Sequence, residues 1–142
     1  MDPVKTVRKM GQAARQAAEK LSVTRGDQRE AALRACAEAI ADRRERLQEA
    51  NAKDLARSEE FGLSSAMVKR LELSDKRLHS MARALSEMAE QVDPVGRAVC
   101  AYNRPNGLRI EKRRVPIGVV GVVFESRPNV TSDVSGLCIR SG

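Results

Sequence analysis

The chain contains 142 residues, of which 42% are hydrophobic and 32% charged, and its formal net charge is +7. This composition is typical of one globular domain, and it excludes an intrinsically disordered chain, a membrane-spanning protein and an enzyme of two ordinary-sized domains. The three cysteines lie far apart and there is only one histidine, which indicates neither a disulfide framework nor a metal site.

Residues 1–92 show the periodicity of a series of amphipathic helices. Apolar or small residues recur at spacings of three and four along residues 4–21, 33–40, 47–55, 66–71 and 78–92. Asp2 and Ser74 are typical N-caps, and Pro3 suits a first helical turn. Gly62 is well placed to end the third helix.

A β-hairpin is predicted after these helices. Residues 99–102 have the composition of a strand, and Asn106-Gly107 is a common hairpin turn. Residues 108–111 alternate apolar with charged side chains, as a half-buried strand does.

The segment Ile117–Phe124 contains no polar residue and is rich in β-branched side chains. It predicts a central strand buried on both faces, as in a parallel sheet. A helix follows, with Asn129, Thr131 or Ser132 as its cap. No other segment has the character of a partner strand, so we expect an incomplete sheet at the front end of a longer α/β protein. The alternative is that the hairpin alone pairs with this strand.

Residues 124–129 follow the predicted strand, where open α/β sheets bind their ligands. They bring a cation, a hydroxyl, an amide and a helix N-terminus together, a set that suits phosphate or an oxyanion. The dinucleotide fingerprint G-x-G-x-x-G is absent. A plain strand-to-helix turn explains the same residues, and Glu125 as a lone carboxylate is a weak general base.

Two other features carry alternatives. Basic residues are in excess between Arg104 and Arg127, and such a patch can attract nucleic acid, a phosphorylated metabolite or an anionic cofactor. The alternative, which we favour for any one cluster, is the solvated surface of a basic protein. Cys36, Cys100 and Cys138 are expected to be small buried residues rather than nucleophiles, because nothing close in sequence activates them. The N-terminus lacks an apolar signal core, so we expect a cytoplasmic protein.

PIGVVGVVFESRPNVTSDVSGLCIRSG, from Pro116 to Gly142, resembles the first nucleotide-domain segment of bacterial gamma-glutamyl phosphate reductases. The likeness extends upstream through GLRIEKRRV, DPVGR and LQEANAKDLARSEEFGLSSAMVKRLELSDKRL, which is essentially the whole chain. This family, also called glutamate-5-semialdehyde dehydrogenase, is part of the aldehyde dehydrogenase superfamily. Its members are much longer, so the resemblance implies an N-terminal fragment.

The resemblance implies an α/β fold of N-terminal helices, a hairpin extension and the first strand-helix unit of an aldehyde-dehydrogenase-like sheet, here incomplete. Residues 1–92 would be the helical part of the nucleotide-binding domain, 93–115 the oligomerisation extension, and 116–142 the first strand, turn and helix of the sheet. The implied activity is NADPH-dependent reduction of L-glutamate 5-phosphate to L-glutamate 5-semialdehyde and phosphate in proline biosynthesis. We expect the isolated chain to be inactive and the full protein to be a homo-oligomer.

The superfamily holds the oxyanion with an asparagine in the turn after this strand. Arg127 occupies that position and Asn129 lies nearby, so the resemblance implies an oxyanion or substrate contact by one of them. Phe124, Glu125, Ser126 and Arg127 correspond to the turn that contacts the cofactor, NADP(H). The nucleophilic cysteine of the family is expected downstream, so no catalytic residue is assigned in this chain.

Two readings from other classes remain at this point. One is a basic helical domain that binds nucleic acid, which the net charge favours. The paired acids along the helices and the scarcity of stacking aromatics count against it, so we expect no nucleic-acid partner. The other is a regulatory module that joins the oligomer of a longer homologue through its extension.

Overall fold

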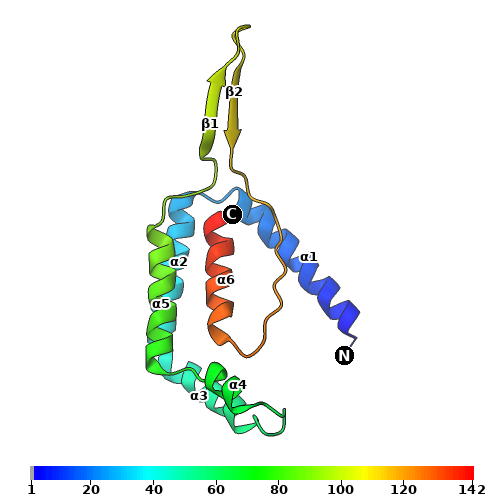
Figure 1. Cartoon of the computed structure of the whole chain (residues 1–142), viewed down its shortest axis with the longest axis vertical. Coiled ribbons are helices and arrows are strands. Elements are labelled where there is room, and N and C mark those ends of the chain that lie inside the picture. The colour runs from blue at the N-terminus through cyan, green and yellow to red at the C-terminus, as the bar shows by residue number, and fades with distance from the viewer. Residues whose placement is uncertain (1) are drawn as a thin grey trace.

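Three mutually packed helices form the centre of the fold (Figure 1): α2 (Gly26–Asp42), α5 (Asp75–Glu90) and α6 (Pro128–Ser141). A computed structural model describes residues 2–142. Its elements in chain order are α1 (Pro3–Ser22), α2 (Gly26–Asp42), α3 (Arg44–Ala56), α4 (Ser65–Leu71), α5 (Asp75–Glu90), β1 (Ala98–Asn103), β2 (Arg109–Arg113) and α6 (Pro128–Ser141).

The core lies where the apolar stripes of α2 and α5 meet. Leu33 and Ala37 of α2 pack with Leu85 and Ala89 of α5, and all four side chains are buried. Burying one leucine contributes about 1.5–3 kcal/mol. Gly136 lets α6 lie against this pair, because a β-carbon there would stand 2.6 Å from Leu85 Cδ2. The core therefore fixes the position of α6.

The predicted helix starts are confirmed at two places. The Asp2 carboxylate accepts hydrogen bonds from the Val4 and Lys5 amides at 3.0 and 3.5 Å. The Ser74 hydroxyl accepts one from the Arg77 amide at 3.4 Å. Each side chain satisfies amides that a helix start leaves without partners.

Two predicted helix boundaries are wrong. The third helix ends at Ala56, and Gly62 lies in the following turn, where its φ of +61° suits glycine. The last helix begins at Pro128, ahead of the predicted caps. Proline fits this first turn because its ring sets a helical φ and the missing N–H has no partner there anyway.

The hairpin prediction is confirmed. β1 and β2 pair antiparallel, with Tyr102 opposite Ile110, and Gly107 takes a φ of +84° in the turn between them. Figure 1 shows the hairpin projecting away from the helices. Every residue of β1 is exposed, because no other layer covers it.

The predicted central strand is not formed. Ile117–Phe124 is a loop without ladder bonds, and its side chains are exposed, Ile117 by 88%. Among residues 2–142 the only sheet is the hairpin, whose strands pair with each other, so the alternative that the hairpin pairs with this segment is also wrong. A strand needs neighbours at its edges, and the described residues supply none. Among residues 2–142 the predicted elements are therefore present, α6 included, except for this first strand of the parallel sheet.

The apolar stripe of α1 is present but faces solvent. No residue of this helix is buried, and Val4, Val7 and Met10 are largely exposed. In Figure 1 the loop from β2 to α6 passes between α1 and α6. The helix and the loop thus leave a broad apolar surface uncovered.

The expected burial of the cysteines is wrong for two of them. Cys36 and Cys100 are exposed, whereas Cys138 is partly buried. Cys36 lies beside the buried stripe of α2 rather than on it, and Cys100 belongs to the uncovered hairpin. Within residues 2–142, no helix is long and apolar enough to cross a membrane, and no cluster of three or more metal-ligating side chains is present.

Candidate functional site

A polar cavity of about 440 Å³ lies between α4, α5 and the N-terminal part of α6. Its apolar lining comes from Met81 and Ala84 of α5. Its polar lining comes from three segments that are distant in sequence: Arg70, Arg77, Ser80, Arg127, Asn129 and Asp133. Three of these side chains are cationic and one is acidic, so the cavity favours anions.

The start of α6 contributes two of the predicted residues. Arg127 is the N-cap residue and Asn129 lies in the first turn. The Asn129 amide donates to a carboxylate oxygen of Asp133 at 2.9 Å, one helical turn on. The structure therefore places Arg127 and Asn129 at the same cavity. That one of the two contacts an oxyanion or the substrate stays a prediction.

Arg77 is held in place by the end of α4. Its Nη1 donates to the carbonyls of Arg70 and Glu72, each at 2.6 Å, and its Nη2 donates to the Lys69 carbonyl at 2.8 Å. These carbonyls carry the partial negative charge of a helix C-terminus, which the guanidinium compensates. Arg77 thus joins α4 to α5 and adds a fixed positive charge to the cavity wall.

Asn51, which is buried in α3, also holds the segment between α4 and α5. Its amide donates to the Leu71 carbonyl at 2.9 Å, and its carbonyl oxygen accepts from the Leu73 amide at 2.7 Å. A buried side chain that satisfies two backbone groups is costly to move. Arg70 therefore projects from a helix whose end is held by two separate side chains, Asn51 and Arg77.

Phe124, Glu125 and Ser126 do not line this cavity. They form the exposed turn before α6, in which Ser126 takes a φ of +50° and Phe124 is 47% exposed. Their predicted contact with a cofactor stays a prediction. Arg70 and Arg77 were missed, because in the sequence they are ordinary basic residues of a short helix and a helix start.

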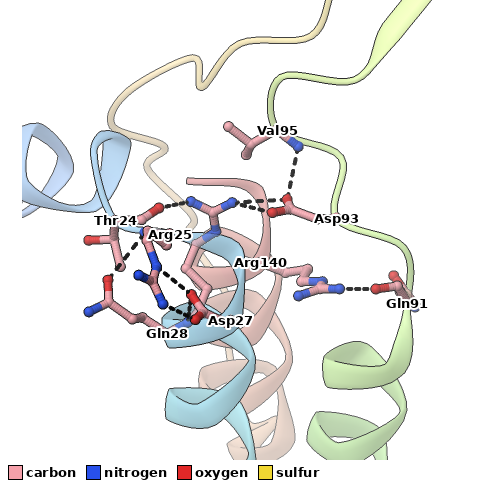
Figure 2. A network of polar contacts seen from close by, with 9 residues as sticks. Thr24, Arg25, Asp27, Gln28, Gln91, Asp93, Val95 and Arg140 are labelled. Carbon is pink, nitrogen blue, oxygen red and sulfur yellow. Dashed lines mark hydrogen bonds and ion pairs between the residues drawn. The ribbon is translucent and has the colours of Figure 1, made fainter.

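A second polar cluster ties α6 to the rest of the fold (Figure 2). Arg29 is 2% exposed, and its Nη2 donates to both carboxylate oxygens of Asp93, at 2.9 and 2.7 Å. Its Nη1 donates to the Thr24 carbonyl. On α6, the buried Arg140 donates to the Gln91 carbonyl. The cluster joins α2, α6 and the connection after α5.

The pKa of Asp93 reflects this cluster. Partial burial by itself raises the pKa, but the hydrogen bond from the Val95 amide and the Arg29 guanidinium outweigh burial. Arg140 adds to their effect, and the pKa lies below its ordinary value. Asp93 is therefore ionised at neutral pH and compensates a buried cation.

This lowered pKa predicts a loss of stability in acid. A carboxyl group with a lower pKa in the folded state stabilises the fold above its unfolded pKa, here an ordinary 3.8. The contribution disappears as the pH falls from there through the folded pKa. Urea unfolding of the wild type and of Asp93→Asn should show a stability difference that shrinks across this range. A difference that does not depend on pH would contradict the linkage.

Curated proteins that resemble this chain are named gamma-glutamyl phosphate reductase. The chain is 46% identical over 141 residues to gamma-glutamyl phosphate reductase of Mesorhizobium japonicum, covering 99% of this chain and 33% of the relative. It is 44% identical over 141 residues to the enzyme of that name from Thermobifida fusca, covering 99% of this chain and 34% of the relative. The chain thus spans about a third of the length of these curated relatives. No family model matches it.

Solved structures agree with the sequence relatives. Gamma-glutamyl phosphate reductase of Thermotoga maritima matches with a TM-score of 0.88 at 35% identity, over 94% of this chain and 32% of that one. The Saccharomyces cerevisiae protein of the same name matches with a TM-score of 0.88 at 32% identity, over 94% of this chain and 34% of that one. The fold is that of the N-terminal part of these structures. Over nearly its whole length, the chain is therefore homologous to gamma-glutamyl phosphate reductases.

Proposed function

We propose that the chain is the N-terminal third of an NADPH-dependent reductase that converts L-glutamate 5-phosphate to L-glutamate 5-semialdehyde and phosphate in proline biosynthesis. One observation carries the proposal: 46% identity over 99% of the chain to a curated gamma-glutamyl phosphate reductase. In the whole enzyme, residues 1–92 and 116–142 would form part of the nucleotide-binding domain. Residues 93–115, which contain the projecting hairpin, would join subunits of a homo-oligomer in the cytoplasm.

The cavity residues supply binding rather than the reacting nucleophile. Arg127 can hold an anionic oxygen by charge-assisted hydrogen bonds, and the Asn129 side chain lies beside it. The cysteines of this chain line no part of the cavity. The thiol that attacks the acyl phosphate would therefore come from outside residues 1–142, and the isolated chain would be inactive.

A nicotinamide cofactor would supply the hydride when bound. The exposed turn of Phe124, Glu125, Ser126 and Arg127 fits one side of such a cofactor, with an accessible aromatic ring and one cation. The chain carries no glycine-rich phosphate loop of the G-x-G-x-x-G kind, and the loop before the turn is open to solvent. These residues would therefore line the cofactor without enclosing it.

A chimera tests the proposal. Residues 1–142 would replace the matching third of the Mesorhizobium japonicum reductase, and the product would be expressed in a proline auxotroph that lacks its own reductase. We expect growth without proline from the chimera and none from the 142-residue chain. Purified chimera should oxidise glutamate semialdehyde only with NADP and phosphate. A folded chimera without this activity, or growth supported by the chain alone, would contradict the proposal.

Two variants of the chimera separate the cavity from the basic hairpin. Arg127→Ala should lower kcat/KM by about 100-fold, because it removes a charged hydrogen-bond donor to an anionic oxygen of the substrate. Lys112→Ala removes an exposed cation from β2 and should leave kcat/KM within about twofold. Equal activity of the two variants would remove Arg127 from the site.

A further inference from the structure

We propose that the cavity between α4, α5 and the start of α6 is an anion-binding subsite in which Arg70 and Arg127 bind one oxyanion of the substrate. The inference rests on the proposed function for the identity of that substrate. It adds Arg70 to the residues that the sequence predicts for an anion contact, Arg127 and Asn129. Arg70 lies in α4, and no sequence motif relates it to the turn before α6. Its ligand is a small oxyanion, either a phosphate or a carboxylate.

The side chains that line the cavity carry a net positive charge. Arg70, Arg77 and Arg127 line a cavity whose lining also includes one carboxylate, Asp133, and the apolar side chains Met81 and Ala84. The Asp133 carboxylate accepts from the Asn129 amide at 2.9 Å. Three cations against one acid leave an excess positive charge in a concave site, where electrostatic attraction is focused.

The three arginines of the cavity differ in how many of their hydrogen-bond donors are already engaged. The Arg77 guanidinium is engaged by backbone carbonyls, so it acts as a fixed charge. By contrast, the Arg70 and Arg127 side chains have no hydrogen bond or ion pair to any residue between positions 2 and 142. Many other arginines among residues 2–142 form ion pairs with acids, such as Arg34 with Glu30 and Arg83 with Glu87. Two guanidinium forks therefore remain available for an oxyanion.

The fold holds the backbone segments from which Arg70 and Arg127 project. Arg127 is held at the start of α6, where the Val130 amide donates to its carbonyl at 3.0 Å. Arg70 projects from the end of α4, which Arg77 and Asn51 attach to α5 and α3. The segment of Arg70 is thus anchored by the side chains of Asn51 and Arg77, and that of Arg127 by the backbone bond that starts α6. Fixed backbone positions lower the entropy lost when an anion binds.

Nuclear magnetic resonance titration of the 142-residue chain tests the site directly. The ¹⁵N-labelled chain would be titrated with inorganic phosphate, and separately with L-glutamate, at constant ionic strength adjusted with chloride. We expect saturable shifts of the amides of Ser80, Val130 and Asp133. Tighter binding of phosphate assigns the phosphate of the substrate to the subsite, and tighter binding of glutamate assigns a carboxylate.

Matched variants make the test specific. Arg70→Gln and Arg127→Gln should each weaken binding about tenfold, since each removes a hydrogen-bond donor to a charged group. Arg8→Gln removes an exposed cation of α1, a helix that contributes no residue to the cavity lining, and should leave binding unchanged. Arg127→Lys, which keeps the charge, covers the case in which a glutamine variant loses its cooperative unfolding. It should bind more weakly than the wild type, because lysine lacks the planar fork.

The outcomes separate this inference from the proposed function. Shifts that do not saturate, or that respond equally to Arg8→Gln, would overturn the subsite and indicate attraction by net charge only. The titration needs no turnover, so an active chimera whose 142-residue chain binds no anion refutes the subsite alone. An inactive chimera whose chain binds phosphate through Arg70 and Arg127 refutes the reductase alone.

Discussion

Asp93→Ala is expected to lower the free energy of unfolding by about 3 kcal/mol, because it leaves the buried Arg29 without its carboxylate. Arg29 is 2% exposed and Asp93 is the acid that it contacts. The side chain of Asp93 is itself 33% exposed, so water compensates part of the loss and the value lies at the low end of the range for buried pairs. The Val95 amide loses an acceptor as well.

Urea unfolding followed by circular dichroism at neutral pH measures this effect. Glu87→Ala is the matched control, because its ion pair with Arg83 joins two exposed side chains. Such pairs contribute about 0–1 kcal/mol, and the control should stay within that range. Similar losses in the two variants would show that the contact between Arg29 and Asp93 is no stronger than a surface pair.

Gly136→Leu is expected to destabilise the chain by about 3 kcal/mol, the upper end of the usual cost of overpacking, because α6 lies close to α5 at this position. A β-carbon at this position would lie 2.6 Å from Leu85 Cδ2 and 2.8 Å from Met88 Sδ, and 3.7 Å from Leu33 Cδ2. Relief would require the Leu85 and Met88 side chains to shift, or α6 to move away from α5. Since α6 carries Arg127 into the cavity, the same substitution in the chimera should also lower reductase activity.

Gly11→Leu is the control for helix propensity. Gly11 lies in α1, and apart from its chain neighbours and the backbone of its own helix, no atom of residues 2–142 lies within 4 Å of the position where a β-carbon would stand. Leucine should therefore be neutral or stabilise the helix by up to about 1 kcal/mol, the usual cost of glycine in a helix interior. Comparable destabilisation by both substitutions would mean that the close approach of α6 does not depend on Gly136.

The site was predictable only in the part that is local in sequence. Arg127 and Asn129 stood out because the cation, the amide and the helix start occur within a few residues of one another. Arg70 and Arg77 carry no such signal. They reach the cavity because Asn51 and the carbonyls at the end of α4 fix the helix beside α5. A lining assembled from separate helices depends on their packing, which spacing along the chain does not report.

The sequence by itself determined the helices, the caps at Asp2 and Ser74 and the hairpin turn at Gly107, since each depends on residues within one or two turns of the chain. Tertiary structure decided the rest. Whether Ile117–Phe124 becomes a strand depends on hydrogen-bonding neighbours, and residues 2–142 provide none. Which arginines share a cavity depends on how α4, α5 and α6 pack. The physical reason is range: helix and turn bonds close locally, whereas sheet edges and cavities need distant segments to meet.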